Sequence, residues 1–214
     1  MDVKRHSEPG ATPSALADAR SRPSSARVAD DALLDAARQC VLAVGVRRTT
    51  LAEIARTAQV SRMTVYRRFP DVRSVLAALM TREFSGLLQR VSESGRDAAH
   101  SRARIVHIAS AGVRVLSADP LFRILLDVDA ELLLPYIVER LGATQHFAEL
   151  ALRALLEEGH RDGSVRTGDV AVQARSVLLV VQSFAFSLRP ATVDLDEAAL
   201  LAEFRHLVEA GLKP

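Results

Sequence analysis

The 214-residue sequence is short of several residue types, and each shortage excludes a class of structure. Its single cysteine, Cys40, cannot form a disulfide within the chain. Cys40 lies in the apolar stretch AARQCVLAV, so we predict that it packs in a core. Tryptophan is absent and aromatic residues make up only 4% of the chain, whereas Ala, Leu, Arg and Val are abundant. Alanine and long unbranched side chains favour helices over sheets.

Long apolar runs are also lacking. The best candidate, VLLVV at residues 177–181, is followed by Gln182 and Ser183 and is far shorter than the roughly 20 residues of a membrane helix. The N-terminus lacks the continuous apolar core of a secretory signal. We therefore expect a cytoplasmic protein. With 49% apolar residues, the chain still has enough material to bury one or two cores.

Neither sign of charge is in large excess, since the net charge is +2, but the charges are unevenly distributed. Residues 1–73 hold 13 Lys or Arg against 8 Asp or Glu, and residues 74–214 hold 15 against 18. Within residues 45–73, seven Arg stand against Glu53 and Asp71. Such a local excess attracts phosphate. A solvated, charged helix face is the alternative interpretation.

Helical periodicity runs through the chain after an N-terminal segment that breaks it. Residues 1–28 are rich in Ser, Pro, Ala and Arg, and we predict that they form a flexible arm. Beyond this arm, no alternating strand pattern competes with the helical spacing of apolar residues. The predicted helices span residues 31–44, 51–58, 61–68, 72–94, 102–117, 121–127, 132–158, 170–188 and 195–211.

Side chains that accept backbone N–H bonds stand at the starts of the first four predicted helices. Thr50 and Glu53 have the spacing of a capping box at the start of the second helix. Gly45 is suited to the left-handed residue after the first helix. The other expected caps are Asp30 or Asp31, Ser61, and Asp71 or Ser74.

The two short helices predicted over residues 51–58 and 61–68 have the lengths and the tight connection of a helix-turn-helix. We expect a small core between them, formed by Ile54, Ala55, Ala58, Val60 and Val65. The remaining side chains of the second helix then point outward, namely Arg62, Met63, Thr64, Tyr66, Arg67 and Arg68. This mixture suits phosphates and base edges. For Tyr66, a partly buried packing ring is the alternative.

The stretch TTLAEIARTAQVSRMTVYRRFPDVRSVL, residues 49–76, resembles the DNA-binding region of TetR-family transcriptional regulators. The positions that carry the resemblance are Thr49, Thr50, Ile54, Ala55, Ala58, Val60, Ser61, Tyr66 and Phe69. It implies that the helix over 61–68 enters the major groove. It further implies contacts to base edges or nearby DNA backbone for Arg62, Thr64 and Arg67. It implies phosphate contacts for Tyr66 and Arg68, and contacts to the DNA backbone for Thr50 and Ser61.

Two positions depart from the family pattern. Gln59 stands where the family has Gly at the turn, which costs up to about 1–2 kcal/mol if the backbone there is left-handed. Val72 stands where a Lys is usual near the start of the next helix, with Arg73 beside it. We expect Arg73 to contact phosphate in place of that Lys, from a different angle; the alternative is that this contact is lost.

The larger part of the chain is similar to the ligand-sensing and dimerisation domain of the same family. We therefore expect residues 29–73 to form the DNA-binding domain and residues 74–214 to form the sensing domain. The resemblance implies a pocket among the middle helices, and for each of its candidate wall residues ordinary core packing is the alternative. The candidates are His107, Phe122, Tyr136, His146, Phe147 and Phe184.

The last two predicted helices carry more apolar surface than one core needs. VLLVVQSFAF is apolar almost all round, and the helix over 195–211 has a broad apolar stripe. A second copy of the chain is the simplest partner for this surface. The alternative is that both helices are central to a monomer.

Motifs for other chemistry are missing. The six His residues do not cluster with metal-ligand spacing, and the carboxylates of DVDAE, residues 127–131, fit a solvated loop better than a calcium loop. We find no nucleophile motif, phosphate loop or dinucleotide fingerprint. We expect no cofactor and no metal, and no enzymatic activity.

The sequence predicts an all-α protein, and the resemblance implies a homodimeric transcriptional regulator that responds to a small apolar or amphipathic effector. We expect a repressor whose two helix-turn-helix units bind a palindromic operator in double-stranded DNA. The main alternative is an architectural DNA-binding protein without a ligand. A helical enzyme is the third interpretation.

Overall fold

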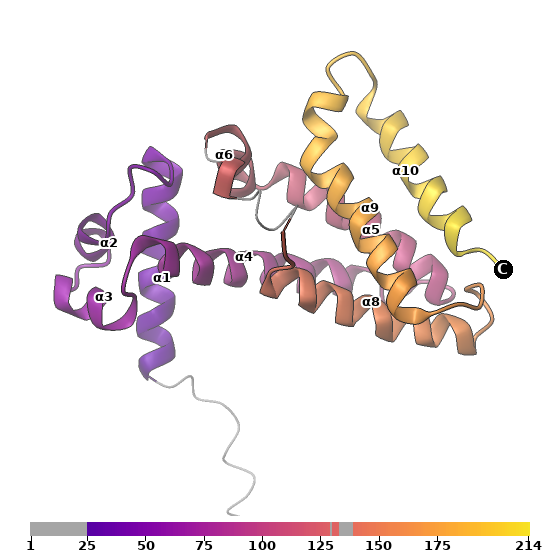
Figure 1. Cartoon of the computed structure of the whole chain (residues 1–214), viewed down its shortest axis with the longest axis horizontal. Coiled ribbons are helices and arrows are strands. Elements are labelled where there is room, and N and C mark those ends of the chain that lie inside the picture. Colours follow the sequence, from indigo (N-terminus) through magenta and orange to yellow (C-terminus); the bar gives the residue numbers. More distant parts are fainter. Residues whose placement is uncertain (1–24, 129, 133–138) are drawn as a thin grey trace, which may run out of the picture.

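The computed structural model describes residues 25–128, 130–132 and 139–214, and every regular element in these ranges is a helix (Figure 1). The predicted all-α fold is confirmed. The helices are α1 (Ser25–Val44), α2 (Leu51–Thr57), α3 (Arg62–Arg68), α4 (Val72–Ser94), α5 (Ser101–Ala118), α6 (Pro120–Val128), the short 3-10 helix η2 (Ala130–Leu132), α8 (Ala143–Arg161), α9 (Val170–Ala191) and α10 (Glu197–Leu212).

Two groups of helices lie at opposite ends of the molecule and are joined by α4 (Figure 1). At one end α1, α2 and α3 pack together with the start of α4, and their buried cluster also takes in Leu121, Phe122 and Leu125 of α6. At the other end α5, α8, α9 and α10 enclose a second cluster, in which Phe204 and Leu156 are fully buried. Because α6 packs on the first cluster and directly follows α5, it links the two ends.

Most helix ends follow the expected caps, with two exceptions. The expected cap at Asp30 or Asp31 is wrong, because α1 begins at Ser25 and both residues lie inside it. The helix predicted over 132–158 is wrong in its first part, since residues 139–142 are not helical. Gly142 is extended there, and its N–H donates to the Gln145 side chain at 2.5 Å, so a new helix begins at Ala143. The predicted burial of Cys40 is confirmed.

The first turn of α5 is closed by residues from the loop that follows α8. The Ser101 N–H donates to Oδ2 of Asp162 at 3.0 Å, and the Arg102 N–H donates to Oγ of Ser164 at 3.1 Å. His100 caps the third amide through its Nδ1. The first N–H groups of a helix have no intrahelical acceptor, so these bonds tie the loop to α5. Hydrogen bonds from Ser164, and then from Ser101, hold the pKa of the Asp162 carboxyl far below its ordinary value of 3.8.

Replacing Asp162 by alanine should lower the free energy of unfolding by about 1 kcal/mol at pH 7, the usual scale for losing a capping acceptor. Because the pKa of Asp162 is lowered in the folded state, its stabilisation is present above the ordinary pKa and is lost as the pH falls through the folded-state value. The difference between parent and Asp162→Ala in urea denaturation should therefore shrink on acidification. Asp194→Ala, in the exposed loop before α10, is the control. An equal difference at pH 7 and in strong acid would contradict this account.

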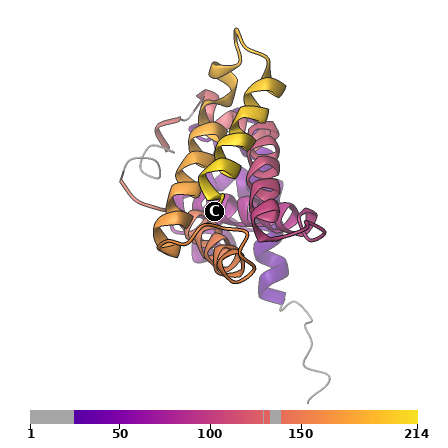
Figure 2. The same cartoon turned by 90° about the vertical axis from the view of Figure 1, so that its right-hand side faces the viewer.

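One face of α9 and α10 is not covered by the rest of the described chain. Figure 2 shows the two helices side by side on the near side of the molecule. Large apolar side chains are exposed along them, among them Val172, Leu179, Val180 and Leu207. By length and composition α9 could also cross a membrane, although it packs against α5 and α8 here. The uncovered face agrees with the surplus of apolar surface that the sequence indicates.

Candidate nucleic-acid interface

The N-terminal caps of α2 and α3 are formed by the residues that the sequence indicates. The Glu53 N–H donates to Oγ1 of Thr50 at 3.2 Å, and the Thr50 N–H donates to Oε2 of Glu53 at 3.3 Å, which confirms the capping box. The Thr64 N–H donates to Oγ of Ser61 at 3.1 Å. These bonds fix the start of each short helix. They also place the Thr50 and Ser61 hydroxyls at the first turns, on exposed backbone.

The turn between α2 and α3 is closed by a residue with left-handed backbone angles. This residue is Gln59, at the position where the family pattern has Gly. Gln59 has φ of 56° and is the one non-glycine residue with positive φ in the described part of the chain. The Val60 N–H donates to the Ala55 carbonyl at 3.0 Å and the Gln59 N–H to the Arg56 carbonyl at 3.2 Å. This pair of bonds is the Schellman arrangement, in which glycine usually takes the left-handed position.

Replacing Gln59 by glycine should raise the free energy of unfolding by about 0.5–1 kcal/mol, because the relief of left-handed strain exceeds the extra entropy that glycine loses on folding. Chemical denaturation at equilibrium measures the change. Ala58→Gly is the matched control, since Ala58 has right-handed φ and ψ of −76° and −5° and should lose stability on substitution. A Gln59→Gly protein less stable than the parent would show that the side chain of Gln59 contributes more than its backbone costs.

The small core under the helix-turn-helix buries fewer residues than the sequence predicts. Ile54 and Val65 are fully buried and Ala55 is 2% exposed, which confirms these three predictions. Val60 is 37% exposed, so its predicted place in this core is wrong. The left-handed turn directs Val60 to the rim of a hollow instead. Within α3 itself, Val65 is the one fully buried residue.

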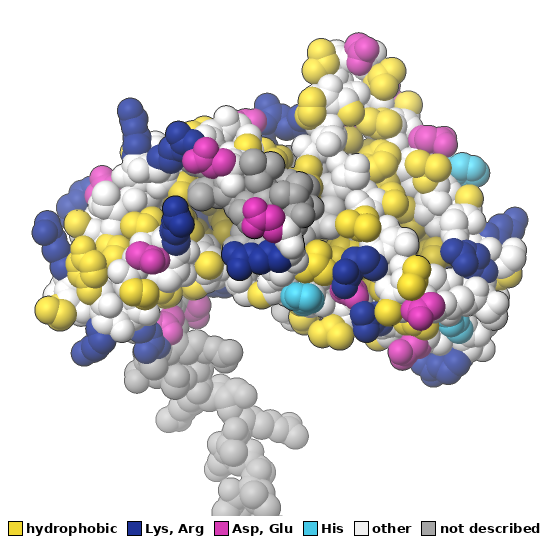
Figure 3. All heavy atoms as spheres, viewed as in Figure 1, with side chains coloured by type: hydrophobic (Ala, Val, Ile, Leu, Met, Phe, Trp, Pro, Cys, Tyr) yellow, Lys and Arg dark blue, Asp and Glu magenta, His cyan; other side chains and the backbone are white. Residues whose placement is uncertain are grey.

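The outward face of α3 carries the side chains that the sequence indicates. Arg62, Met63, Tyr66, Arg67 and Arg68 are exposed and Thr64 is half-buried. Tyr66 is 53% exposed, so the alternative of a packed ring is wrong. Figure 3 shows Lys and Arg side chains gathered around the end of the molecule that α1, α2 and α3 occupy. This end combines positive charge, hydroxyls and a flat ring.

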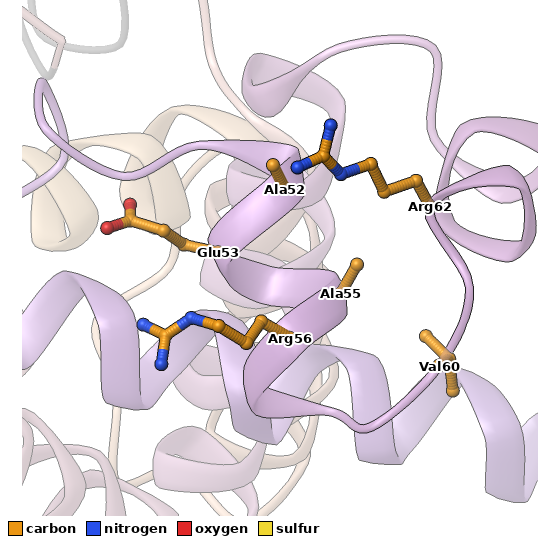
Figure 4. Close-up of a pocket in the computed structure, with 6 residues that line it drawn as sticks. All are labelled: Ala52, Glu53, Ala55, Arg56, Val60 and Arg62. Carbon is orange, nitrogen blue, oxygen red and sulfur yellow. The ribbon is translucent and has the colours of Figure 1, made fainter.

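An open hollow of about 370 Å³ lies between α2 and the start of α3. Figure 4 shows the Arg62 guanidinium reaching over Ala52, while Glu53 and Arg56 lie along the other side of α2. The residues that line the hollow are Ala52, Glu53, Ala55, Arg56, Val60 and Arg62. Arg56 is exposed on α2 and is not among the site residues predicted from the sequence.

Two further arginines of the expected site have different surroundings. Arg68, in the last turn of α3, donates from Nε and Nη2 to the two carboxylate oxygens of Asp30 on α1. This hydrogen bonding, and then the negative charge of Asp30, raises the pKa of Arg68 above its ordinary value. Arg73 is exposed in the first turn of α4, next to the capping residue Asp71. The sequence pattern predicts Asp30 only as a helix cap and does not indicate its pairing with Arg68.

The acidic segment DVDAE forms ion pairs with two distant elements. Asp127 accepts from Nη1 of Arg189 on α9 at 2.6 and 2.8 Å. Glu131 lies 2.6 Å from Nη2 of Arg47, in the loop between α1 and α2. Across the described residues, no group of three or more His, Cys, Asp or Glu is placed to hold a metal ion. Asp127 is therefore linked to α9, and Glu131 to the loop that leads into α2.

The expected pocket residues are spread over separate surroundings. Phe122 is 2% exposed in the first cluster, with ring centroids 5.7 Å from Phe84 and 5.5 Å from Phe186. Phe184 packs on Phe204 in the second cluster. The other described candidates are His107, whose Nε2 lies 3.1 Å from Oγ of Ser94, and His146 and Phe147, which are exposed on α8. Tyr136 lies outside the described residues.

A second hollow, of about 330 Å³, lies between α8 and α9 around a buried carboxylate that is not among the residues predicted from the sequence. Glu149 is 3% exposed and accepts from Arg153 at 2.5 Å and from Arg175 at 2.7 Å. These arginines, Arg153 first, lower the pKa of Glu149 below its ordinary value. The spacing of Glu149 and Arg153, four residues apart on a helix, is the one local signal that could have indicated this pair.

Comparisons with known proteins agree with the geometry of this end of the molecule. Residues 33–79 match the family model described as bacterial regulatory proteins, tetR family. Uncharacterised HTH-type transcriptional regulators of Mycobacterium bovis and Mycobacterium tuberculosis are 42% identical to the chain over 180 residues, which cover 84% of this chain and 92% of each relative.

Solved structures share the fold over most of the chain. A TetR-family transcriptional regulator from Pectobacterium atrosepticum has a TM-score of 0.69 at 21% identity and covers 90% of this chain and 98% of its own. The transcriptional regulator FadR from Bacillus subtilis, in complex with stearoyl-CoA, has a TM-score of 0.60 at 19% identity and covers 85% of this chain and 98% of its own. The chain belongs to the TetR family of DNA-binding transcriptional regulators.

Proposed function

We propose that this protein is a repressor that binds a palindromic operator as a homodimer and releases it when a small effector binds. The observation that carries the proposal is the outward face of α3, where five exposed side chains sit on a two-turn helix with a capped start. We place the DNA-binding domain at residues 29–73 and the sensing domain at 74–214. Residues 25–28 of the predicted N-terminal arm lie inside α1, and residues 1–24 lie outside the described part of the chain. A regulator of this kind acts in the cytoplasm, where the chromosome lies.

The proposed DNA contacts follow from the positions of the side chains. Arg62, Thr64 and Arg67 project from the first and last turns of α3 and are assigned to base edges in the major groove. Tyr66 and Arg68 are assigned to phosphates flanking the groove. The remaining contacts are to the DNA backbone, from Thr50 and Ser61 at the helix starts and from Arg73 on α4.

The uncovered face of α9 and α10 supports a dimer. Val172, Leu179 and Val180 recur along one side of α9, and Leu207 lies on the neighbouring α10. An apolar face of this kind is buried when two copies pack in a symmetric bundle of four helices. The two α3 helices would then face successive major grooves of one operator.

Contacts of α6 support coupling between an effector and DNA. Two ring contacts connect α6 with its neighbours. Phe122 on α6 packs against Phe84 on α4 and against Phe186 on α9. The ion pair between Arg47 and Glu131 adds a contact at the loop before α2. An effector that favours a different position of α6 would change the spacing of the two α3 helices and weaken DNA binding, by a coupling of about 1–3 kcal/mol.

An effector screen on the dimer tests this proposal. Because the Bacillus subtilis FadR structure holds stearoyl-CoA, long-chain acyl-CoA is a rational first probe among small amphipathic ligands. We expect a ligand that raises the melting temperature also to release operator DNA in gel shifts, and sedimentation to show a dimer. Ligands that stabilise the protein but never alter DNA binding would instead support the architectural alternative.

A further inference from the structure

The orientation of α3 is only weakly fixed by apolar packing. The helix has seven residues and buries one side chain, Val65. A helix of this length is unstable alone and relies on tertiary contacts. Its first turn is held by the Ser61 cap and by the closed turn at Gln59. Beyond its last turn, the half-buried Phe69 packs against the first cluster. A polar contact from the last turn itself would fix the direction of the outward side chains further.

Arg68 supplies this contact by joining the last turn of α3 to α1. Its Nε and Nη2 donate to the two carboxylate oxygens of Asp30, which is the bidentate geometry that fixes the plane of a guanidinium group. The side chains are 43% and 32% exposed, so the pair lies at the surface beside the face of α3. Asp35, also on α1, pairs instead with Arg82 of α4.

We infer that Asp30 is a positioning residue for DNA recognition, which holds the end of α3 through Arg68 and thereby sharpens the discrimination between DNA sequences. This inference rests on the proposed use of α3 in the major groove. Asp30 has a second effect, because its carboxylate offsets the positive charge of Arg68 next to the phosphates. By offsetting this charge, Asp30 weakens the electrostatic binding of DNA of any sequence. By holding the end of α3, it raises the preference for the correct sequence.

Two substitutions on α1 that remove the same charge test the inference. Asp30→Asn should bind a scrambled site several-fold more tightly than the parent at low salt and should show a steeper salt dependence, because the charge of Arg68 is no longer offset. Its ratio of affinities for the selected and scrambled sites should fall about tenfold, since the end of α3 is less fixed. Asp35→Asn, the matched control, should leave that ratio within about twofold.

A coupled substitution separates a positioning role from a general effect of charge. In an Arg68→Gln background, Asp30→Asn should not lower the selected-to-scrambled ratio any further, because the partner of Asp30 is already gone. A further fall of the ratio in this background would overturn the inference. The inference would also be overturned if Asp30→Asn alone had the same selected-to-scrambled ratio as the parent.

Amide hydrogen exchange tests the same contact without DNA. The Phe69 N–H, which donates to the Val65 carbonyl at 2.8 Å, should exchange about tenfold faster in Asp30→Asn and at the parent rate in Asp35→Asn. Equal exchange in Asp30→Asn and the parent overturns the inference, whatever the DNA results. If the exchange accelerates but the parent has no preferred DNA sequence, the proposed function fails while the hold of Asp30 on α3 stands.

Discussion

Replacing Arg67 by alanine should remove most of the preference for one base pair in the operator while leaving the fold intact. Arg67 is exposed in the last turn of α3, and its guanidinium can bond two acceptors on one base edge. Loss of such a pair costs about 1–3 kcal/mol of discrimination, or about 5- to 150-fold in relative affinity. Binding of the operator and of single-base variants, measured by fluorescence anisotropy, gives the change position by position.

Arg114→Ala is the matched control for this substitution, because it removes an exposed arginine from α5, away from α3. It should leave the preference at every operator position unchanged. If Arg67→Ala weakens all operator variants equally and only lowers the salt dependence by about one unit, then Arg67 contacts phosphate rather than bases.

Replacing Phe122 by alanine should lower the free energy of unfolding by about 3–5 kcal/mol, the range for truncating a buried aromatic residue. Phe122 is 2% exposed, and its ring packs between those of Phe84 and Phe186. The cavity left behind would lie where α4, α6 and α9 meet. Equilibrium urea denaturation measures the loss.

Phe147→Ala is the control, because it removes the same ring from an exposed position on α8, where Phe147 is 51% exposed. Its cost should be below about 1 kcal/mol. Both residues were candidates for a ligand pocket, so the comparison also tests that assignment. If Phe122→Ala is as stable as Phe147→Ala, the Phe122 ring does not hold α6 in place.

Local chemistry explains why part of the structure could be predicted from the sequence. The caps at Thr50 and Ser61 and the left-handed Gln59 depend on residues within five positions, and sequence patterns report such short-range bonds. The same reasoning failed at Gly142, because apolar spacing continues on both sides of a residue that begins a new helix.

Contacts between distant residues could not be predicted in this way. Arg68 and Asp30 are 38 positions apart, and nothing in either neighbourhood indicates the partner. The candidate pocket residues were selected as polar or aromatic side chains in apolar stretches. That pattern does not distinguish Phe122, packed between two other rings, from Phe147, which faces solvent. The way in which the helices cross decides which of these aromatic side chains contact one another.

Selection of bound DNA from a random pool tests the central claim most directly, because it asks whether the outward face of α3 reads sequence. The account predicts a palindromic consensus whose half-sites lie about one helical turn apart, bound by a dimer. Arg67→Ala should lose the consensus at one position in each half-site. Retention of DNA without any consensus would contradict sequence-specific regulation, and failure to retain DNA would contradict the assignment of α3 as the recognition helix.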